Sequence, residues 1–215
     1  MGIPTYYPTA MADGFPPGYR WLYEYAGIIH RDISLDNLML RKVGDKVYGV
    51  LNDMDLAITV GVESASSKQR TGTKPFMAID LLQLEPPVHM YRHDLESMFY
   101  VLVWITSRFH DGKEIVDAPL QEWADEGGVA LVSEKYRFIM SEPPQPTPAF
   151  NPLGCWVVSL QTMIRDGFSA KAKYRSELAI AVRSKAAYPS TFKDETLGGF
   201  VTFDKFQAIL DAKLY

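Results

Sequence analysis

The most informative segment of the chain is GIIHRDISLDNLML, residues 27–40. Its centre is a His-Arg-Asp triplet that ends at Asp32, and four residues separate this triplet from Asn37. A carboxylate at Asp32 can accept the proton of a substrate hydroxyl, and an amide oxygen at Asn37 can reach a divalent metal bound to phosphate groups. The triplet alone is a weak signal, so the interpretation depends on its spacing to Asn37 and on the segments that follow.

A second carboxylate follows in GVLNDMDLA, residues 49–57. Two short apolar segments and a Gly-Asp pair predict a β-hairpin before it: Leu38 to Lys42, Val47 to Leu51, and the turn at Gly44-Asp45. In isolation, Asp53 and Asp55 are as readily ordinary turn residues as metal ligands. Asp53 comes after this hairpin, however, and its position resembles that of the metal-binding triplet of a protein kinase, which implies that it supplies a second oxygen ligand to the same metal. We therefore predict that Asn37 and Asp53 bind Mg2+ and, with it, the phosphates of a nucleotide.

The clearest helix is expected from about His93 to Arg108. Its apolar residues cover almost the whole circumference after the first turn, and a helix that is apolar on all sides must lie inside the protein. Further helical segments are expected at about 119–126, 128–141, 153–166, 174–187 and 203–214, the last with Thr202 as its N-cap. The predicted fold class is mainly α with a small β-hairpin, built around the buried central helix.

The remaining segments are read from their composition. Residues 1–18 contain four prolines and three glycines and predict a flexible leader, which leaves 19–215 as the folded unit. Tyr19 to Tyr25 is expected to form the last turns of a helix that stops at Gly27. The polar stretch 57–75 is expected to form a long loop.

Taken together, these segments resemble the fungal-type protein kinase domain. The stretches that support the resemblance are GIIHRDISLDNLML, GVLNDMDLA, RTGTKPFMAIDLL, RHDLESMFYVLVWI and DETLGGFVTFDKFQAIL. The resemblance runs from about Tyr19 to the last residue. It implies the C-terminal lobe of a protein kinase, which transfers the γ-phosphate of ATP to a Ser or Thr hydroxyl of a protein substrate.

The resemblance also implies a role for each residue of the catalytic loop. Asp32 would be the catalytic base, and Asn37 and Asp53 would hold Mg2+ on the phosphates of ATP. His30 would brace the loop. Arg31, beside the base, would bind a phosphorylated activation loop.

Three further residues have implied roles outside the catalytic loop. Thr73 would donate a hydrogen bond to the catalytic Asp32, and Asp80 would stand for the Glu of the Ala-Pro-Glu triplet that ends an activation segment. Asp94, at the start of the buried helix, would accept hydrogen bonds from the backbone amides of the catalytic loop. The segment that precedes Thr73 contains four hydroxyl residues, Ser64, Ser66, Ser67 and Thr71. They are either regulatory phosphorylation sites or part of a solvated loop.

The sequence departs from the kinase pattern in two ways. Ser34 stands where a Ser/Thr kinase usually has a Lys that neutralises the transferring phosphate, and Met54 and Asp55 replace the aromatic residue and Gly of the metal-binding triplet. In addition, only 29 residues precede His30, and the chain has no Gly-x-Gly. We therefore expect the ATP-binding N-lobe to be missing, so that this chain alone is inactive and requires that lobe or a partner surface.

A missing N-lobe would leave apolar groups exposed around Leu38, Leu40 and Met54. Two alternatives to a kinase remain open. The first is a pseudokinase-like module that binds partners without catalysis. The second is a small-molecule phosphotransferase, which shares the Asp-x4-Asn loop, although Arg31 and the Thr-Gly-Thr segment argue against it.

Composition limits the other classes of function. The net charge of -4 and the lack of a Lys/Arg cluster argue against nucleic-acid binding. The longest apolar run, Met98 to Ile105, is far shorter than the ~20 residues needed to cross a bilayer. With a single cysteine, Cys155, no intrachain disulfide can form. An intracellular protein with no membrane partner is expected.

Overall fold

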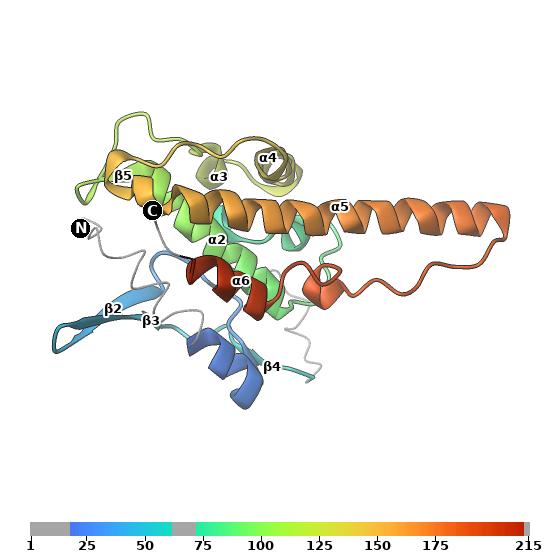
Figure 1. Cartoon of the computed structure of the whole chain (residues 1–215), viewed down its shortest axis with the longest axis horizontal. Helices are drawn as coiled ribbons and strands as arrows, with labels where there is room; N and C mark the ends of the chain where they lie inside the picture. The colour runs from blue at the N-terminus through green and yellow to red at the C-terminus, as the bar shows by residue number, and fades with distance from the viewer. Residues whose placement is uncertain (1–17, 62–71, 213–215) are drawn as a thin grey trace.

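The computed structural model describes residues 18–61 and 72–212. Helices dominate this part of the chain, and three small antiparallel sheets of two strands each accompany them (Figure 1). This agrees with the predicted fold class of mainly α with a small hairpin. The predicted leader lies almost entirely outside the described residues, and the division into a leader and a folded unit stays a prediction.

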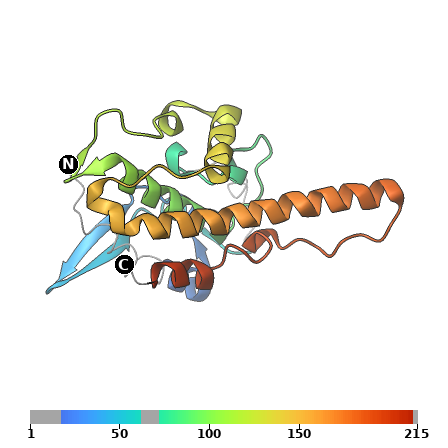
Figure 2. The same ribbon diagram turned by 45° about the horizontal axis from the view of Figure 1, so that its top comes forward.

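The central helix is α2 (Tyr91–Arg108), and every residue of it except Trp104 is buried. It begins two residues before its predicted start. The neighbouring elements pack around it, with α5 (Gly154–Ser184) running across the molecule beside it (Figures 1 and 2). The prediction of a helix buried on all sides is confirmed, and polar residues such as Asp94 and Glu96 are buried with the apolar ones.

The front of the described chain is a helix over residues 18–26. It ends at Gly27, whose φ of 63° lies in the left-handed region that favours glycine. Strand β1 (Ile28–Ile29) follows and pairs with β4 (Ile58–Thr59). The expected loop at 57–75 therefore contains a short strand, which its polar composition did not indicate.

The predicted hairpin is present as β2 (Leu38–Val43) and β3 (Lys46–Leu51). The register pairs Leu38 with Leu51 and Met39 with Val50. Because side chains alternate along a strand, Leu38 points to the core while Met39 is 52% exposed. The expected exposure of Leu38 was wrong for this reason, and Leu40, on the same face, is half-buried against the core.

The second half of the chain differs from prediction at one place. We expected two segments at 153–166 and 174–187, but α5 is a single helix of 31 residues. Its apolar pattern ends with the buried residues near Lys171, while the sequence beyond still has residues with good helix propensity and no proline. The helix therefore continues past the point at which its burial ends.

Short elements complete the fold: β5 (Phe109–His110), β6 (Lys113–Glu114), α3 (Glu122–Asp125), α4 (Gly128–Met140) and α6 (Phe203–Leu210). The short 3-10 helices are η2 (Lys74–Phe76), η3 (Ile79–Leu82), η4 (Pro148–Leu153) and η5 (Asp194–Thr196). The predicted cap of α6 is present, since the Thr202 side chain accepts a hydrogen bond from the backbone N–H of Lys205. Among the described helices, none is long and apolar enough to cross a membrane.

Candidate active site

The carboxylate of Asp32 is held from two sides. Its Oδ1 accepts hydrogen bonds from the backbone N–H of Thr73, at 2.9 Å, and from the Thr73 hydroxyl, at 3.0 Å. Its Oδ2 accepts a bond of 3.1 Å from the side-chain amide of Asn37, which also donates to the backbone carbonyl of Asp32 at 2.9 Å. The amide nitrogen of Asn37 is thus used within the loop, and its amide oxygen takes no part in either bond.

The end of the hairpin brings Asp53 to this loop. The backbone N–H of Asn52 donates to the carbonyl of Asn37 at 2.9 Å, and the Asn52 carbonyl lies 2.9 Å from Nε2 of the His30 ring. Asp53 follows directly, with a φ of 59°, and its Oδ1 accepts the backbone N–H of Asp55 at 3.2 Å. The chain segments that carry Asp32, Asn37 and Asp53 therefore meet at one place.

These three side chains suit Mg2+ by their chemistry. Mg2+ is usually bound through one or two carboxylates together with substrate phosphates and water. The described residues contain no cluster of three or more His, Cys, Asp or Glu side chains that would form a metal site by themselves. A site made of two carboxylates and an amide oxygen would need the nucleotide phosphates to complete it.

Asp94 fixes the loop that carries His30 and Arg31. Its Oδ2 accepts the Tyr19 hydroxyl at 2.6 Å, the backbone N–H of His30 at 3.0 Å and that of Arg31 at 3.3 Å. Its Oδ1 lies 2.7 Å from Nε2 of His89. Burial by itself would raise the pKa of Asp94, but the His89 ring and these donors lower it below its usual value. The carboxylate is therefore held ionised inside the core.

The loop residues beside Asp32 are buried. The ring of His30 is wedged between two backbone groups, because its Nδ1 accepts the N–H of Asp32 at 3.3 Å while Nε2 bonds Asn52. Arg31 has a φ of 75°, and burial lowers the pKa of its guanidinium. Ser34 is only 2% exposed, so its hydroxyl is enclosed by the protein. The proposed phosphorylation sites at 64–71 lie outside the described residues.

Asp80 lies away from this centre and ties the end of the predicted activation segment to the helices. Its Oδ2 accepts Nη2 of Arg92 at 2.5 Å and Nζ of Lys171 at 2.8 Å, and its Oδ1 accepts the Gln83 amide at 3.1 Å. Burial opposes ionisation of this carboxyl, but the two cations lower its pKa below the usual value. Asp80 is thus a buried anchor between η3, α2 and α5.

Three residues that hold the site were not predicted from the sequence. Gly72 has a φ of 116°, and a Cβ there would come within 3.2 Å of the Arg31 carbonyl oxygen, so only glycine allows the close approach of Thr73 to Asp32. Asn52 links the hairpin to the loop, and Tyr19 reaches Asp94. The Thr-Gly-Thr sequence was a usable signal for Gly72, whereas nothing in the sequence pairs Tyr19 with a residue 75 positions away.

Apolar side chains are exposed beside the site. On the outer face of the hairpin these are Met39, Val43, Tyr48 and Val50, and Met54 and Leu56 follow in the turn after Asp53. The prediction that Met54 is exposed is confirmed. The exposed apolar face begins two residues after Asn37 and continues to the turn at Asp53.

The comparison with protein families agrees with the motifs. A family model described as fungal protein kinase matches residues 10–106, a little under half of the chain. This stretch includes the catalytic loop, the hairpin, Thr73, Asp80 and Asp94, and the resemblance to the fungal protein kinase family is confirmed there. No curated protein matches the chain.

Proposed function

We propose that this chain supplies the catalytic half of an ATP-dependent protein kinase that phosphorylates Ser or Thr. The observation that supports the proposal most directly is the position of Asp32, whose carboxylate accepts hydrogen bonds from Thr73 on one side and from Asn37 on the other. The backbone of Asn52 in turn bonds both Asn37 and His30. The family match covers all of these residues. The kinase-like lobe is proposed as the architecture that places them together.

In the proposed reaction, Asp32 orients the hydroxyl of the substrate and accepts its proton as the oxygen attacks the γ-phosphorus of ATP. The bond between the γ-phosphorus and its bridging oxygen breaks, and ADP leaves with the electron pair of that bond. Thr73 holds Asp32 through Oδ1 and Asn37 holds it through Oδ2, so the carboxylate is fixed in one orientation. Mg2+, bound by Asn37 and Asp53, would neutralise charge on the phosphates.

The outer face of the hairpin is the proposed floor beneath the nucleotide base. Met39 and Val50 are paired across the strands, and both are exposed next to the proposed metal ligands. An apolar surface of this kind suits a flat aromatic ring. We propose that the other side of the nucleotide is covered by an N-lobe or by a partner surface, because the sequence of this chain has no Gly-x-Gly loop to wrap the phosphates.

A non-catalytic binding module is the second candidate. Ser34 favours it, because a buried hydroxyl supplies no charge to the transferring phosphate. Without that cation, phosphoryl transfer would be slower, since positioning and charge neutralisation account for nearly all catalysis of this reaction. A small-molecule phosphotransferase is less favoured, because the contact of Thr73 with Asp32 orders the segment that a peptide substrate would occupy.

The test is titration of the chain with Mg-ATP, measured by calorimetry, for the wild type, Asp53→Asn and Asp55→Asn. Asp55 is a matched control in the same turn, since its backbone N–H and not its side chain bonds Asp53. We expect Asp53→Asn to weaken binding by about tenfold or more and Asp55→Asn to leave it unchanged. Equal binding by the wild type and Asp53→Asn would contradict the role proposed for Asp53, and undetectable binding by all three would favour a binding module or a fragment over a nucleotide site formed by this chain alone.

A further inference from the structure

The outer half of α5 and the chain that returns from it project from the rest of the molecule. Residues of α5 are regularly buried up to Lys171, but beyond it the helix has only one buried residue, Ala181. Figures 1 and 2 both show this part of the helix extending past all the other elements, with the following chain running back along it. We call residues 172–193 the basic arm.

The arm is positively charged in a chain that is negative as a whole. It has five Lys or Arg side chains and one Glu, a net charge of +4, whereas the whole chain has a net charge of -4. Lys173 pairs weakly with Glu177 at 3.9 Å. Within residues 18–61 and 72–212, no ion pair joins an acidic group to Arg175, Arg183 or Lys185. Most of the charge on the arm is therefore not neutralised by the residues that the structure describes.

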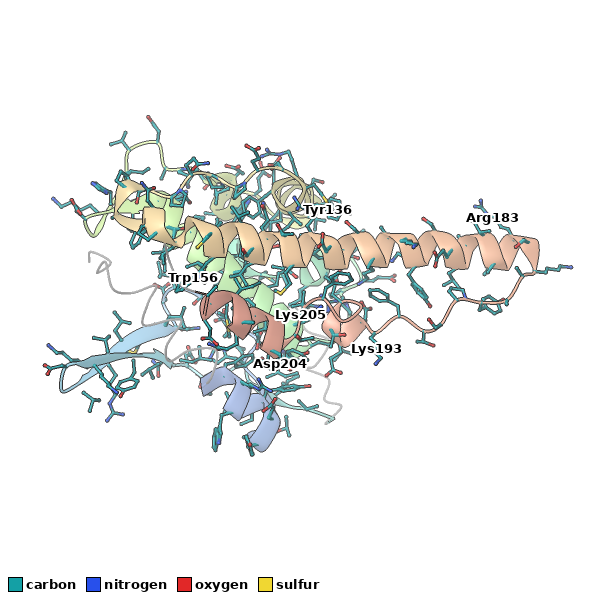
Figure 3. The ribbon with its side chains drawn as sticks, in the orientation of Figure 1. Tyr136, Trp156, Arg183, Lys193, Asp204 and Lys205 are labelled. Atoms are coloured by element: carbon teal, nitrogen blue, oxygen red, sulfur yellow. The ribbon has the colours of Figure 1, made fainter. Side chains whose placement is uncertain are left out.

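Aliphatic side chains lie among these cations. Ile180 is 65% exposed and Val182 is 56% exposed. Seven residues make nearly two turns of helix, so Lys173 lies on the same side as Ile180, whereas Arg175, about 200° further round the helix, lies with Val182 on the opposite side. Each side therefore places a cation and an aliphatic side chain about two turns apart. In Figure 3, Arg183 lies on the side of the helix away from the returning chain, which leaves this side uncovered.

The inner side of the arm and its base are fixed. Tyr174 stacks on Phe192 of the returning chain, with ring centroids 5.4 Å apart. At the base, Lys171 pairs with Asp80 and Asp194, each at 2.8 Å, and Gly167 allows Leu197 to pack directly on the helix. The arm is thus held in one direction before any partner arrives, which reduces the entropy cost of binding.

We propose that the basic arm is a docking surface for an acidic segment of a partner protein, with glutamate or aspartate side chains opposite the cations and an apolar side chain against Ile180, which lies on the same side of the helix as Arg183. The exposed aliphatic groups favour a protein over a nucleic acid, whose backbone offers no apolar counterpart. They are too few for insertion into a bilayer, and the exposed strips of the helix have no Trp or Phe. This proposal does not depend on catalysis by Asp32.

The experiment uses the full chain and a fluorescent helical peptide of about 15 residues, with Glu on one face and Leu on the other. The arm variant is Arg175→Glu/Arg183→Glu/Lys185→Glu. Its matched control, Lys42→Glu/Lys46→Glu/Lys113→Glu, makes the same change in net charge on exposed residues elsewhere. Circular dichroism melting establishes that both variants fold. A third variant, Ile180→Ser/Val182→Ser, removes the aliphatic groups and keeps the charge.

We expect the arm variant to weaken peptide binding by about tenfold or more, the aliphatic variant by about threefold or more, and the control to change it by less than about twofold. Equal weakening by the arm variant and the control would mean that only net charge matters, and would overturn the proposal. Tighter binding to a short DNA duplex, or to vesicles of phosphatidylcholine and phosphatidylserine, than to the peptide would overturn it as well. The peptide-binding results do not depend on the proposed kinase function. Asp53→Asn should bind the peptide as the wild type does, whether or not it has lost Mg-ATP binding.

Discussion

Helix α2 and the outer half of α5 are both rich in charged residues, but they use them in opposite ways. In α2, Arg92 pairs with Asp80, Asp94 accepts hydrogen bonds from the loop at His30, and Glu96 accepts the backbone N–H of Ile79 at 2.9 Å. In the outer half of α5, Arg175 and Arg183 are exposed. Charge inside the core determines where the neighbouring segments lie, whereas charge on the arm is available to another molecule.

The difference follows from the cost of burial. A buried ion loses its hydration, so it is tolerated only where partners replace the lost water. Each charged residue of α2 therefore specifies the position of its partners. An exposed charge keeps its water and contributes little to stability. The two helices should accordingly respond very differently to substitution.

The largest effect is expected at Asp94. Asp94→Ala would leave the Tyr19 hydroxyl and the N–H groups of His30 and Arg31 buried without their acceptor. We expect a loss of about 3–5 kcal/mol in the free energy of unfolding, measured by urea denaturation. Glu177→Ala, on the arm, serves as the control and should cost less than about 0.5 kcal/mol. A loss below about 1 kcal/mol for Asp94→Ala would contradict the role given to α2.

The next effect lies in the packed half of α5. In Gly167→Ala the new Cβ would be 2.6 Å from Cδ2 of Leu197 and 2.8 Å from its Cγ. Overpacking of this kind should cost about 1–3 kcal/mol, as measured by thermal unfolding. Ser176→Ala, farther along the same helix and exposed, should leave the midpoint temperature nearly unchanged. Equal midpoints for the two variants would show that the base of the arm is loosely packed.

A smaller effect concerns Lys135 of α4, which is buried. Its Nζ donates to the carbonyl of Met77 at 2.6 Å and lies 3.7 Å from the centre of the Tyr100 ring. Lys135→Met removes the cost of burying an amine but also removes the hydrogen bond to the Met77 carbonyl. The two effects on the free energy of unfolding oppose each other, so its value near pH 7 should change by about 1 kcal/mol or less.

The pH dependence distinguishes Lys135 from the exposed lysines. Burial lowers its pKa well below the usual value, so between that lowered pKa and ~10.4 the unfolded chain binds more protons at this site than the folded chain. The contribution of Lys135 to stability therefore rises with pH in this window. Urea denaturation from about pH 7 to about 9.5 should show a smaller rise for Lys135→Met than for the wild type, while Lys173→Met should match the wild type. Parallel curves for all three proteins would exclude a buried amine with a lowered pKa.

The smallest effect is expected on the arm. Ile180→Ser removes an aliphatic side chain that is 65% exposed, so the free energy of unfolding should change by about 0.5 kcal/mol or less. Leu160→Ser, in the packed half of the same helix and fully buried, is the contrasting variant and should cost several times more. A similar cost for both would mean that the arm packs against the body in solution.

The sequence was informative where spacing alone defines the structure. The helix around Asp94 follows from apolar residues on every side, the hairpin follows from two apolar runs about a Gly-Asp turn, and the order of Asp32, Asn37 and Asp53 follows from their motifs. These features depend on residues that are close in sequence. The bond of Tyr19 to Asp94 and the contact of Gly167 with Leu197 depend on tertiary packing, which periodicity does not encode.

Two further differences have the same origin. The continuous α5 was predicted as two segments with a break at residues 167–173. In that stretch Gly167 is buried against Leu197 and Lys171 is buried by its ion pair with Asp80, and hydrophobic periodicity detects neither contact. Leu38 was predicted to be exposed, but Met39 is the exposed residue. A strand with apolar residues on both faces does not indicate which face meets the core. In each case the sequence predicted an element without predicting its surroundings.

The long-range bonds of Asp94 also bear on how the protein is made. Tyr19 and His30 precede this carboxylate by 75 and 64 residues. At a synthesis rate of ~5–20 residues per second, the loop emerges from the ribosome a few seconds before the group that anchors it. During that interval the amides of His30 and Arg31 lack the carboxylate that accepts their hydrogen bonds in the folded protein. The order of translation thus separates the synthesis of the loop around His30 from the synthesis of the carboxylate that fixes it in the folded protein.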